Sequence, residues 1–299
     1  MSTYTIQWYP GHIARAERQL KEQLKRVDVV LEVLDARVPL ASHHPDIPQW
    51  IGSKPRVLVL NRTDMVPPEV LQNWQTWFVA RGETPYLTDA QRGRGIKTLV
   101  KATQRAGASV NQRRRDRGMR PRPVRAVVLG FPNVGKSALI NRLVGRKVVE
   151  SARRPGVTRQ LKWVRISDEI ELLDAPGVIP PRLDDRVAAL KLAICEDIGE
   201  AAYDNQRVSA AMVEMLAELG EVEVLLSRYG YDPRAMTGES FLHQLARDRY
   251  SADIERAARQ LLDDFRKGIL GPVPLEHPPA IASVGSTRTP LEPASERDY

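Results

Sequence analysis

Short apolar runs alternate with amphipathic stretches over the first 180 residues. Runs rich in Val, Ile and Leu have strand length, and the segments between them place apolar residues at helical spacing. The pattern predicts strands at 27–35, 57–60, 84–87, 126–129, 162–166 and 170–173, and helices at 13–25, 68–81, 97–117 and 138–144. Because strands that alternate with helices usually form parallel sheets, we expect an α/β fold here.

The pattern changes after about residue 180. From 184 to about 267 apolar residues recur at i, i+3 and i+4, which predicts helices alone. Six of the last 28 residues are proline and few are large and apolar, which favours a disordered tail. The predicted domains are an α/β domain at 1–180, a small all-α domain at 181–270 and a proline-rich tail at 271–299.

Composition narrows the class of protein. With 42% hydrophobic and 27% charged residues, the chain is typical of a globular protein. The single cysteine, Cys195, excludes an intramolecular disulfide and a cysteine-rich zinc site. We expect no transmembrane segment, because no run approaches the roughly 18 apolar residues of a membrane helix. The start lacks an apolar signal core, so a cytoplasmic location is expected.

Charge is unevenly distributed along the chain. The net charge is +8, but residues 1–177 hold 31 Lys and Arg against 16 Asp and Glu, whereas residues 178–299 hold 14 against 21. A basic domain favours a polyanionic partner such as RNA, and a solvated basic surface is the alternative. The densest part is an arginine cluster before the strand at 126–129, formed by Arg113, Arg114, Arg115, Arg117, Arg120, Arg122 and Arg125.

The segment Gly130-Phe-Pro-Asn-Val-Gly135-Lys136-Ser137 matches the phosphate-loop pattern G-x-x-x-x-G-K-[ST] between a predicted strand and a predicted helix. Glycines let the backbone wrap a phosphate so that successive N–H groups point inward. Lys136 is expected to reach the β- and γ-phosphates, and Ser137 to join a Mg²⁺ shell.

A second metal-directed motif follows the strand at 170–173. Asp174-Ala-Pro-Gly177 places a carboxylate for Mg²⁺ at a strand end, and the Gly177 N–H is expected to meet the γ-phosphate. Between the two motifs, Thr158 is the best candidate for a hydroxyl that joins the metal shell. An ordinary loop threonine is the alternative for Thr158.

The motif Asn61-Arg62-Thr63-Asp64 follows the strand at 57–60 and predicts the nucleotide base. The Asp64 carboxylate can accept the ring N–H and exocyclic amine of guanine, a donor pair that adenine lacks. Asn61 is expected to brace the loop, and the plane of Arg62 could stack over a base. The motif favours GTP, and opposes a P-loop ATPase or kinase.

The order of these motifs is unusual for a GTPase, since the base-reading motif precedes the phosphate loop. Loops at the carboxyl edge of a parallel sheet converge whatever the chain order, so a circular permutation leaves the site intact. With the segments Trp8-Tyr9-Pro10-Gly11-His12 and Asp35-Ala36-Arg37-Val38-Pro39, the sequence resembles the circularly permuted GTPases of the YlqF/RbgA family over residues 5 to about 270. In the family's notation the motif order is G4-G5-G1-G2-G3.

The resemblance implies a P-loop GTPase domain and an RNA-contacting helical domain that act late in assembly of the large (50S) ribosomal subunit. It adds Asp89 and Ala90 to the guanine loop, with a backbone N–H on guanine O6. His12 would position the water, since Val178 stands where other GTPases have glutamine, and bracing the first helix is its alternative. The nucleotide contacts of the phosphate loop would come from Asn133, Val134, Gly135, Lys136, Ser137 and Ala138.

Asn133 also resembles the asparagine of potassium-activated GTPases, so K⁺ is a possible cofactor beside GTP or GDP and Mg²⁺. We expect a monomer that binds ribosomal RNA and precursors of the large subunit. The alternative function is a GTP-regulated switch that acts on a protein or membrane partner without RNA.

Overall fold

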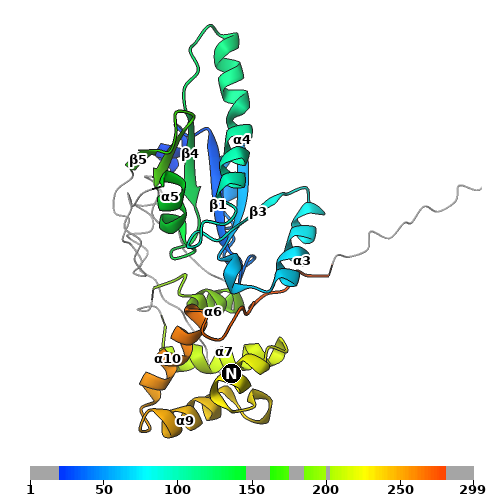
Figure 1. Cartoon of the computed structure of the whole chain (residues 1–299), viewed down its shortest axis with the longest axis vertical. Helices are drawn as coiled ribbons and strands as arrows, with labels where there is room; N and C mark the ends of the chain where they lie inside the picture. Colours follow the sequence, from blue (N-terminus) through cyan, green and yellow to red (C-terminus); the bar gives the residue numbers. More distant parts are fainter. Residues whose placement is uncertain (1–19, 146–161, 175–184, 200–202, 281–299) are drawn as a thin grey trace, which may run out of the picture.

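The computed structural model describes residues 20–145, 162–174, 185–199 and 203–280, and a six-stranded sheet forms its centre (Figure 1). The strand order is β3-β2-β1-β4-β6-β5. The strands are β1 (Val29–Asp35), β2 (Arg56–Asn61), β3 (Pro85–Thr88), β4 (Val124–Leu129), β5 (Lys162–Arg165) and β6 (Ile170–Asp174). All neighbours pair in parallel except β5, which runs antiparallel to β6 because the connection at 166–169 is too short for a crossover.

Helices cover both faces of the sheet. On one face lie α4 (Ile96–Asp116) and α5 (Lys136–Val144), and on the other α2 (Ile47–Ile51), α3 (Pro68–Val79) and the helical residues 20–24. Strand β1 is buried along its whole length, as expected for a central parallel strand. Its residues Leu31 and Val33 face α4 and α5, whereas Val30 packs with α2.

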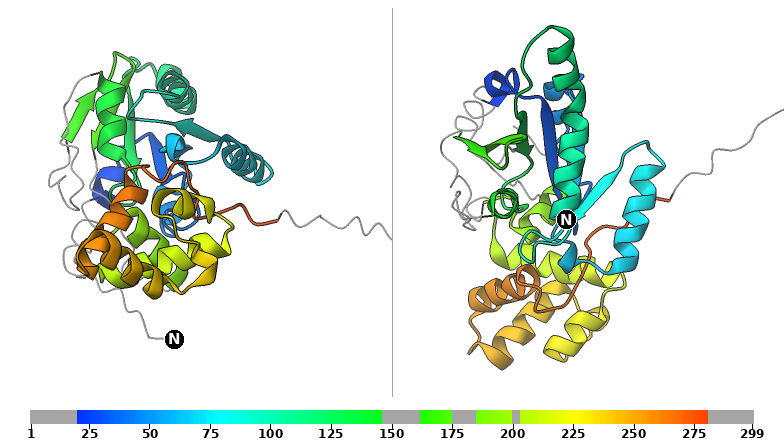
Figure 2. Two further views of the ribbon diagram at one scale, coloured as in Figure 1. Left: turned by 60° about the horizontal axis from the view of Figure 1, so that its bottom comes forward. Right: turned by 45° about the horizontal axis from the view of Figure 1, so that its top comes forward.

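Below the carboxyl edge of the sheet lies the helical domain (Figures 1 and 2). Its elements are α6 (Arg186–Cys195), α7 (Asn205–Glu218), α8 (Glu223–Tyr229), a 3-10 turn (Pro233–Ala235), α9 (Gly238–Arg249) and α10 (Ile254–Arg266). Asp185, Asp204, Thr237 and Asp253 accept backbone N–H bonds at the starts of four of these helices. One hydrophobic core runs from the sheet into this domain. No helix among the described residues is long and apolar enough to span a membrane.

The prediction of a disordered tail from residue 271 was wrong for its first residues. Val273 and Leu275 are each 1% exposed, and their N–H groups donate to the carbonyls of Met65 and Arg37 at 2.9 Å. This C-terminal strap (residues 271–276) therefore packs against the α/β domain that carries the GTP motifs. Two apolar positions, Val273 and Leu275, are too short a pattern to detect by periodicity, and the neighbouring prolines weaken the signal further. Residues 281–299 lie outside the described residues.

Candidate nucleotide-binding site

The phosphate loop joins β4 to α5 at the carboxyl edge of the sheet, as its sequence predicts. Gly135 has φ +97°, and a Cβ there would lie 2.2 Å from Asn61 Nδ2. Only glycine satisfies both the backbone angle and this close approach. The loop and the base-reading motif are therefore in direct contact, although they are more than 70 residues apart.

The Lys136 side chain is folded onto its own loop. It is 6% exposed, and Nζ donates to the carbonyls of Phe131 at 2.6 Å and Gly130 at 3.2 Å. Both acceptors belong to the phosphate loop. The cation therefore lies at the loop where the sequence predicts it, held by carbonyl oxygens.

Asn61 connects three segments of the site. Its Nδ2 donates to the Val134 carbonyl at 2.8 Å, while its Oδ1 accepts from Thr88 Oγ1 at 3.1 Å and from the Ala90 N–H at 3.3 Å. Asn61 is 2% exposed, so these bonds lie out of water. The amide thus braces the loop, as its motif predicts. The Ala90 N–H, from the Asp89-Ala90 pair that the resemblance adds to the guanine loop, is used internally in this structure.

Arg62 contacts the phosphate loop in this structure. Its backbone is left-handed, with φ +63°. Its Nη2 donates to the Asn133 carbonyl at 2.5 Å, and its Nε lies 3.5 Å from Asp35 Oδ2. The guanidinium thus links the base-reading motif to the phosphate loop, and stacking on a base stays a prediction.

The Asp64 carboxylate faces a guanidinium group, that of Arg92. Asp64 lies in a 3-10 turn (Thr63–Met65), where Thr63 Oγ1 donates to the Thr88 carbonyl at 3.1 Å. Arg92 Nη1 lies 3.4 Å from Asp64 Oδ2 and 3.6 Å from Asp89 Oδ2. The amidine-type N–H edge of guanine resembles the edge of a guanidinium group. Since the Arg92 side chain is 59% exposed, it can leave for solvent when a base arrives.

A cavity of about 440 Å³ joins these residues. Its lining comprises Asn61, Arg62, Asp64, Met65, Asp89, Ala90, Gln91, Arg92, Asn133, Gly135, Lys136, Ser137, Ala138, Glu196, Arg266 and Lys267. The structure thus gathers the predicted base and phosphate residues around one space. Sequence reasoning missed Glu196, Arg266 and Lys267, because helical periodicity does not show which helix ends face the sheet.

The helical domain contacts the phosphate loop directly. Asn133 Nδ2 donates to the Glu196 carbonyl at 2.6 Å, in the turn that ends α6. Arg266, at the end of α10, donates to the carbonyls of Ala193 and Ile194 at 2.9 Å. The ends of α6 and α10 are therefore held together where they border the cavity.

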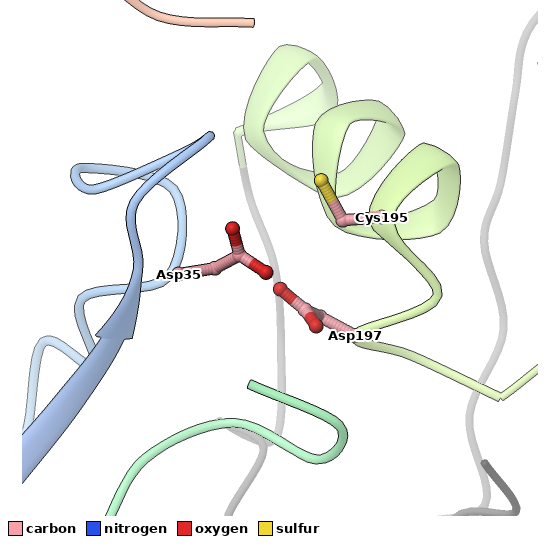
Figure 3. Close-up of side chains that lie close together, drawn as sticks. All are labelled: Asp35, Cys195 and Asp197. Atoms are coloured by element: carbon pink, nitrogen blue, oxygen red, sulfur yellow. The ribbon is translucent and has the colours of Figure 1, made fainter. Parts of the chain in front are cut away.

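A buried polar cluster lies beside this contact (Figure 3). Ligand atoms of Asp35, Cys195 and Asp197 lie within 4.8 Å of one another. Arg37 donates to both oxygens of Asp35, at 2.9 and 2.7 Å, and to the Cys195 carbonyl at 3.3 Å. Because Arg37 already occupies both oxygens of Asp35, this cluster does not fit a divalent cation. It links β1 to the end of α6 instead.

The pKa values of the two buried carboxyl groups, Asp35 and Asp197, are shifted in opposite directions. Burial opposes the charge of Asp35, but the Arg37 guanidinium outweighs it and lowers the pKa of Asp35. Burial, with the Asp35 charge second, raises the pKa of Asp197 well above its ordinary range. Neither oxygen of Asp197 has a hydrogen-bond partner in the described part of the chain. Burial likewise raises the pKa of the Cys195 thiol.

Comparison with known proteins decides the family. Residues 125–226 match the family model described as 50S ribosome-binding GTPase. The chain is 40% identical over 213 residues to ribosome biogenesis GTPase A of Priestia megaterium, covering 71% of this chain and 74% of that protein. The chain belongs to the ribosome biogenesis GTPase A family. The Bacillus cereus member is 34% identical over 279 residues, which cover 91% of this chain and 94% of that one.

Solved structures of YlqF share this fold. A GDP-bound YlqF superposes with a TM-score of 0.64 at 25% identity, over 87% of this chain and 99% of that one. GNP-bound YlqF from T. maritima gives a TM-score of 0.62 at 24% identity over 88% and 98%. As a ribosome biogenesis GTPase A, the chain is a circularly permuted GTPase, with the base motif on β2 ahead of the phosphate loop on β4.

The family implies GTP or GDP and typically Mg²⁺, and the described residues fit such a metal. Ser137 lies in the first turn of α5 and lines the cavity. Asp174 ends β6 and pairs in register with Val128 of β4, which leads into the phosphate loop. The serine hydroxyl is an oxygen ligand of the type that Mg²⁺ prefers. His12, Thr158 and Gly177 lie outside the described residues.

Proposed function

We propose that this GTPase drives a late step in maturation of the large ribosomal subunit, binding the RNA-containing precursor in a GTP-dependent way. The observation that carries this proposal is the shared cavity. Glu196 and Lys267 of the helical domain line it together with the phosphate loop, so occupation by nucleotide can move that domain. The names of the relatives support the ribosomal partner.

Guanine recognition is assigned to the base half of the cavity, which is lined by Asn61, Asp64, Asp89, Ala90 and Arg92. Asp64 accepts the ring N–H and exocyclic amine after Arg92 moves out. Asp89 keeps its loop in place, because its Oδ1 accepts from the Arg92 N–H at 2.9 Å. Thr63 and Asn61 hold this loop to β3 and to the phosphate loop. Buried polar groups that must pair with a specific edge discriminate strongly against a base that lacks it.

Phosphate binding is assigned to the phosphate half of the cavity, which is lined by Asn133, Gly135, Lys136, Ser137 and Ala138. Lys136 exchanges its loop carbonyls for the β- and γ-phosphates, and N–H groups from Val134 to Ala138 surround them. Ser137, Thr158 and Asp174 would hold Mg²⁺, which supplies charge neutralisation at the γ-phosphate. Gly177 would contact that phosphate through its N–H.

Water positioning is assigned to His12, whose imidazole can accept a hydrogen bond from the attacking water. A K⁺ ion held by the Asn133 amide oxygen would add charge near the phosphates. Asn133 at present donates its amide to Glu196, so ion binding would also change the contact with the helical domain. K⁺-dependent turnover measured against Na⁺ tests this part.

The helical domain is proposed to contact ribosomal RNA, although residues 178–299 carry more acidic than basic side chains. Its contacts would rely on local cations such as Arg247, Arg249, Arg256 and Arg259. We propose that the protein acts as a monomer in the cytoplasm.

Co-sedimentation with purified large subunits tests the function. The wild-type protein should pellet with subunits more strongly with a non-hydrolysable GTP analogue than with GDP. Lys136→Ala should lose that nucleotide difference, with the exposed Lys25→Ala as the control. Absence of binding at low salt in every nucleotide state would favour a protein or membrane partner instead.

A further inference from the structure

Helix α4 carries a one-sided stripe of positive charge. Residues 96–116 contain Lys97, Lys101, Arg105, Arg113, Arg114 and Arg115 against one carboxylate, Asp116. Lys97, Lys101 and Arg105 follow at i, i+4 and i+8, and Arg115 returns to the same side five full turns after Lys97. At 1.5 Å per residue, the stripe from Lys97 to Arg115 is about 27 Å long.

Packing of the opposite side keeps this stripe in solvent. Ile96, Leu99 and Ala102 are buried against the sheet. At Gly107 the helix approaches β4 so closely that a Cβ would lie 2.4 Å from Val124 Cγ1. Lys97, Lys101, Arg105 and Arg115 are all exposed. The C-terminal end of α4 points away from the helical domain (Figure 1).

Unlike arginines such as Arg37 and Arg56, the stripe takes no part in the ion pairs of the described residues. None of its four members lies within ion-pair distance of a carboxylate among the described residues. Arg122 and Arg125, which the sequence groups with the arginine cluster, instead pair with Asp28 at 2.7 Å and Glu171 at 3.4 Å. Tertiary structure therefore separates cations that hold the fold together from cations that are available to a partner.

We propose that this α4 stripe (Lys97, Lys101, Arg105 and Arg115) binds the phosphate backbone of double-stranded RNA. This inference rests on the proposed ribosomal function and names the surface that contacts RNA. Double-stranded RNA is recognised largely through its shape and phosphates, which a straight row of cations fits. Helix α4 contains no aromatic residue on which unpaired bases could stack, so single-stranded RNA is not favoured.

The test uses the full chain and a 24-base-pair RNA duplex of mixed sequence. The triple variant Lys97→Gln, Lys101→Gln, Arg105→Gln should lower the slope of log affinity against log salt by about 3, since each lost phosphate contact removes about 1. Affinity at low salt should fall at least about tenfold. Glutamine preserves helix propensity, so the melting temperature and the unstimulated GTP turnover should stay unchanged.

A matched control removes the same charge from ion-paired positions. Lys25→Gln, Arg165→Gln and Arg234→Gln replace cations that pair with Glu22, Asp168 and Asp232. This control variant should keep most of the salt dependence. An unchanged slope in the α4 variant, or an equal loss in both variants, would overturn the inference.

Two further measurements separate the possible outcomes. If the α4 variant loses binding to vesicles of phosphatidylglycerol and phosphatidylcholine but not to RNA, the stripe serves a membrane and the inference is wrong. If wild type fails to pellet with large subunits but the α4 variant loses duplex binding, the proposed function is wrong and the stripe assignment stands. If wild type pellets with subunits but the slope of the α4 variant is unchanged, the proposed function stands and the assignment of RNA binding to the α4 stripe is wrong.

Discussion

The two halves of the nucleotide cavity are prepared to different degrees. In the base half, Asn61, Thr63 and Thr88 hold the loop through side-chain bonds, and one exposed arginine, Arg92, covers Asp64. In the phosphate half, Lys136 bonds its own loop and Asn133 bonds the helical domain. Base binding therefore needs one surface side chain to move, whereas phosphate binding must replace contacts that extend into the other domain. The difference indicates that the phosphates, more than the base, transmit nucleotide state.

The largest effect is expected at Lys136. Lys136→Ala removes the cation that meets the phosphates, and a charged hydrogen bond of about 3 kcal/mol corresponds to about a 100-fold loss of GTP affinity. Isothermal titration with GTP and with guanosine separates the halves, because guanosine lacks phosphates and should bind both proteins equally. Normal GTP binding by the variant would show that the phosphate half is wrongly assigned.

Asp64→Asn tests the base half. Asparagine cannot accept both guanine donors, so GTP affinity should fall by about 30-fold, in line with about 2 kcal/mol for a charged pair. Its amide can instead donate to the 2-oxo group of xanthine, so xanthosine triphosphate should gain affinity. Competition binding with the two nucleotides measures the switch. Equal losses for both would mean that Asp64 does not read the base.

Asn61→Ala should weaken both halves together. The change leaves the Val134 carbonyl and the Ala90 N–H without their partner, which costs about 1–3 kcal/mol of stability. We expect GTP and guanosine affinities to fall by similar factors of about 10. Chemical denaturation gives the stability change. A loss confined to GTP would show that Asn61 acts only on the phosphate loop.

Asp197→Asn probes the junction beside the phosphate half through pH. Because the folded pKa of Asp197 is raised, its stabilising contribution is present below the unfolded pKa of about 3.9 and is lost as pH rises through the folded pKa. Asparagine does not ionise, so the stability of the variant relative to wild type should increase as pH rises. Urea unfolding between pH 5 and 8 measures this difference.

The smallest effect is expected from Arg92→Ala. The arginine competes with guanine for Asp64, but an exposed ion pair contributes less than about 1 kcal/mol. GTP affinity should therefore rise by about twofold, with phosphate-dependent behaviour unchanged. A drop in affinity would mean that Arg92 binds the nucleotide instead of covering its site.

Local patterns in the sequence were sufficient for the sheet, for α3, α4 and α5, and for the motif positions, whereas α2 was not predicted and residues 13–19 of the predicted helix at 13–25 lie outside the described residues. The strands at β1, β2, β4 and β6 are runs of buried aliphatic residues, and glycines mark the phosphate loop. Because parallel strands end at one edge, the sequence also indicated that Asn61, Asp64 and Lys136 meet. These conclusions depend on residues close in sequence and on one general rule of sheet geometry.

Other features depend on which groups lie opposite each other through space. Glu196 and Lys267 line the cavity from helix ends far along the chain. The strap at 271–276 binds the α/β domain through backbone hydrogen bonds that no periodicity in the sequence predicts. Arg62, whose motif gives no hint of its partners, binds Asn133 and Asp35, and Arg122 pairs with Asp28 while Arg115 stays exposed. A charged side chain pairs with the nearest partner of opposite charge. The folded chain brings that partner from segments distant in sequence, so the composition of a motif cannot reveal it.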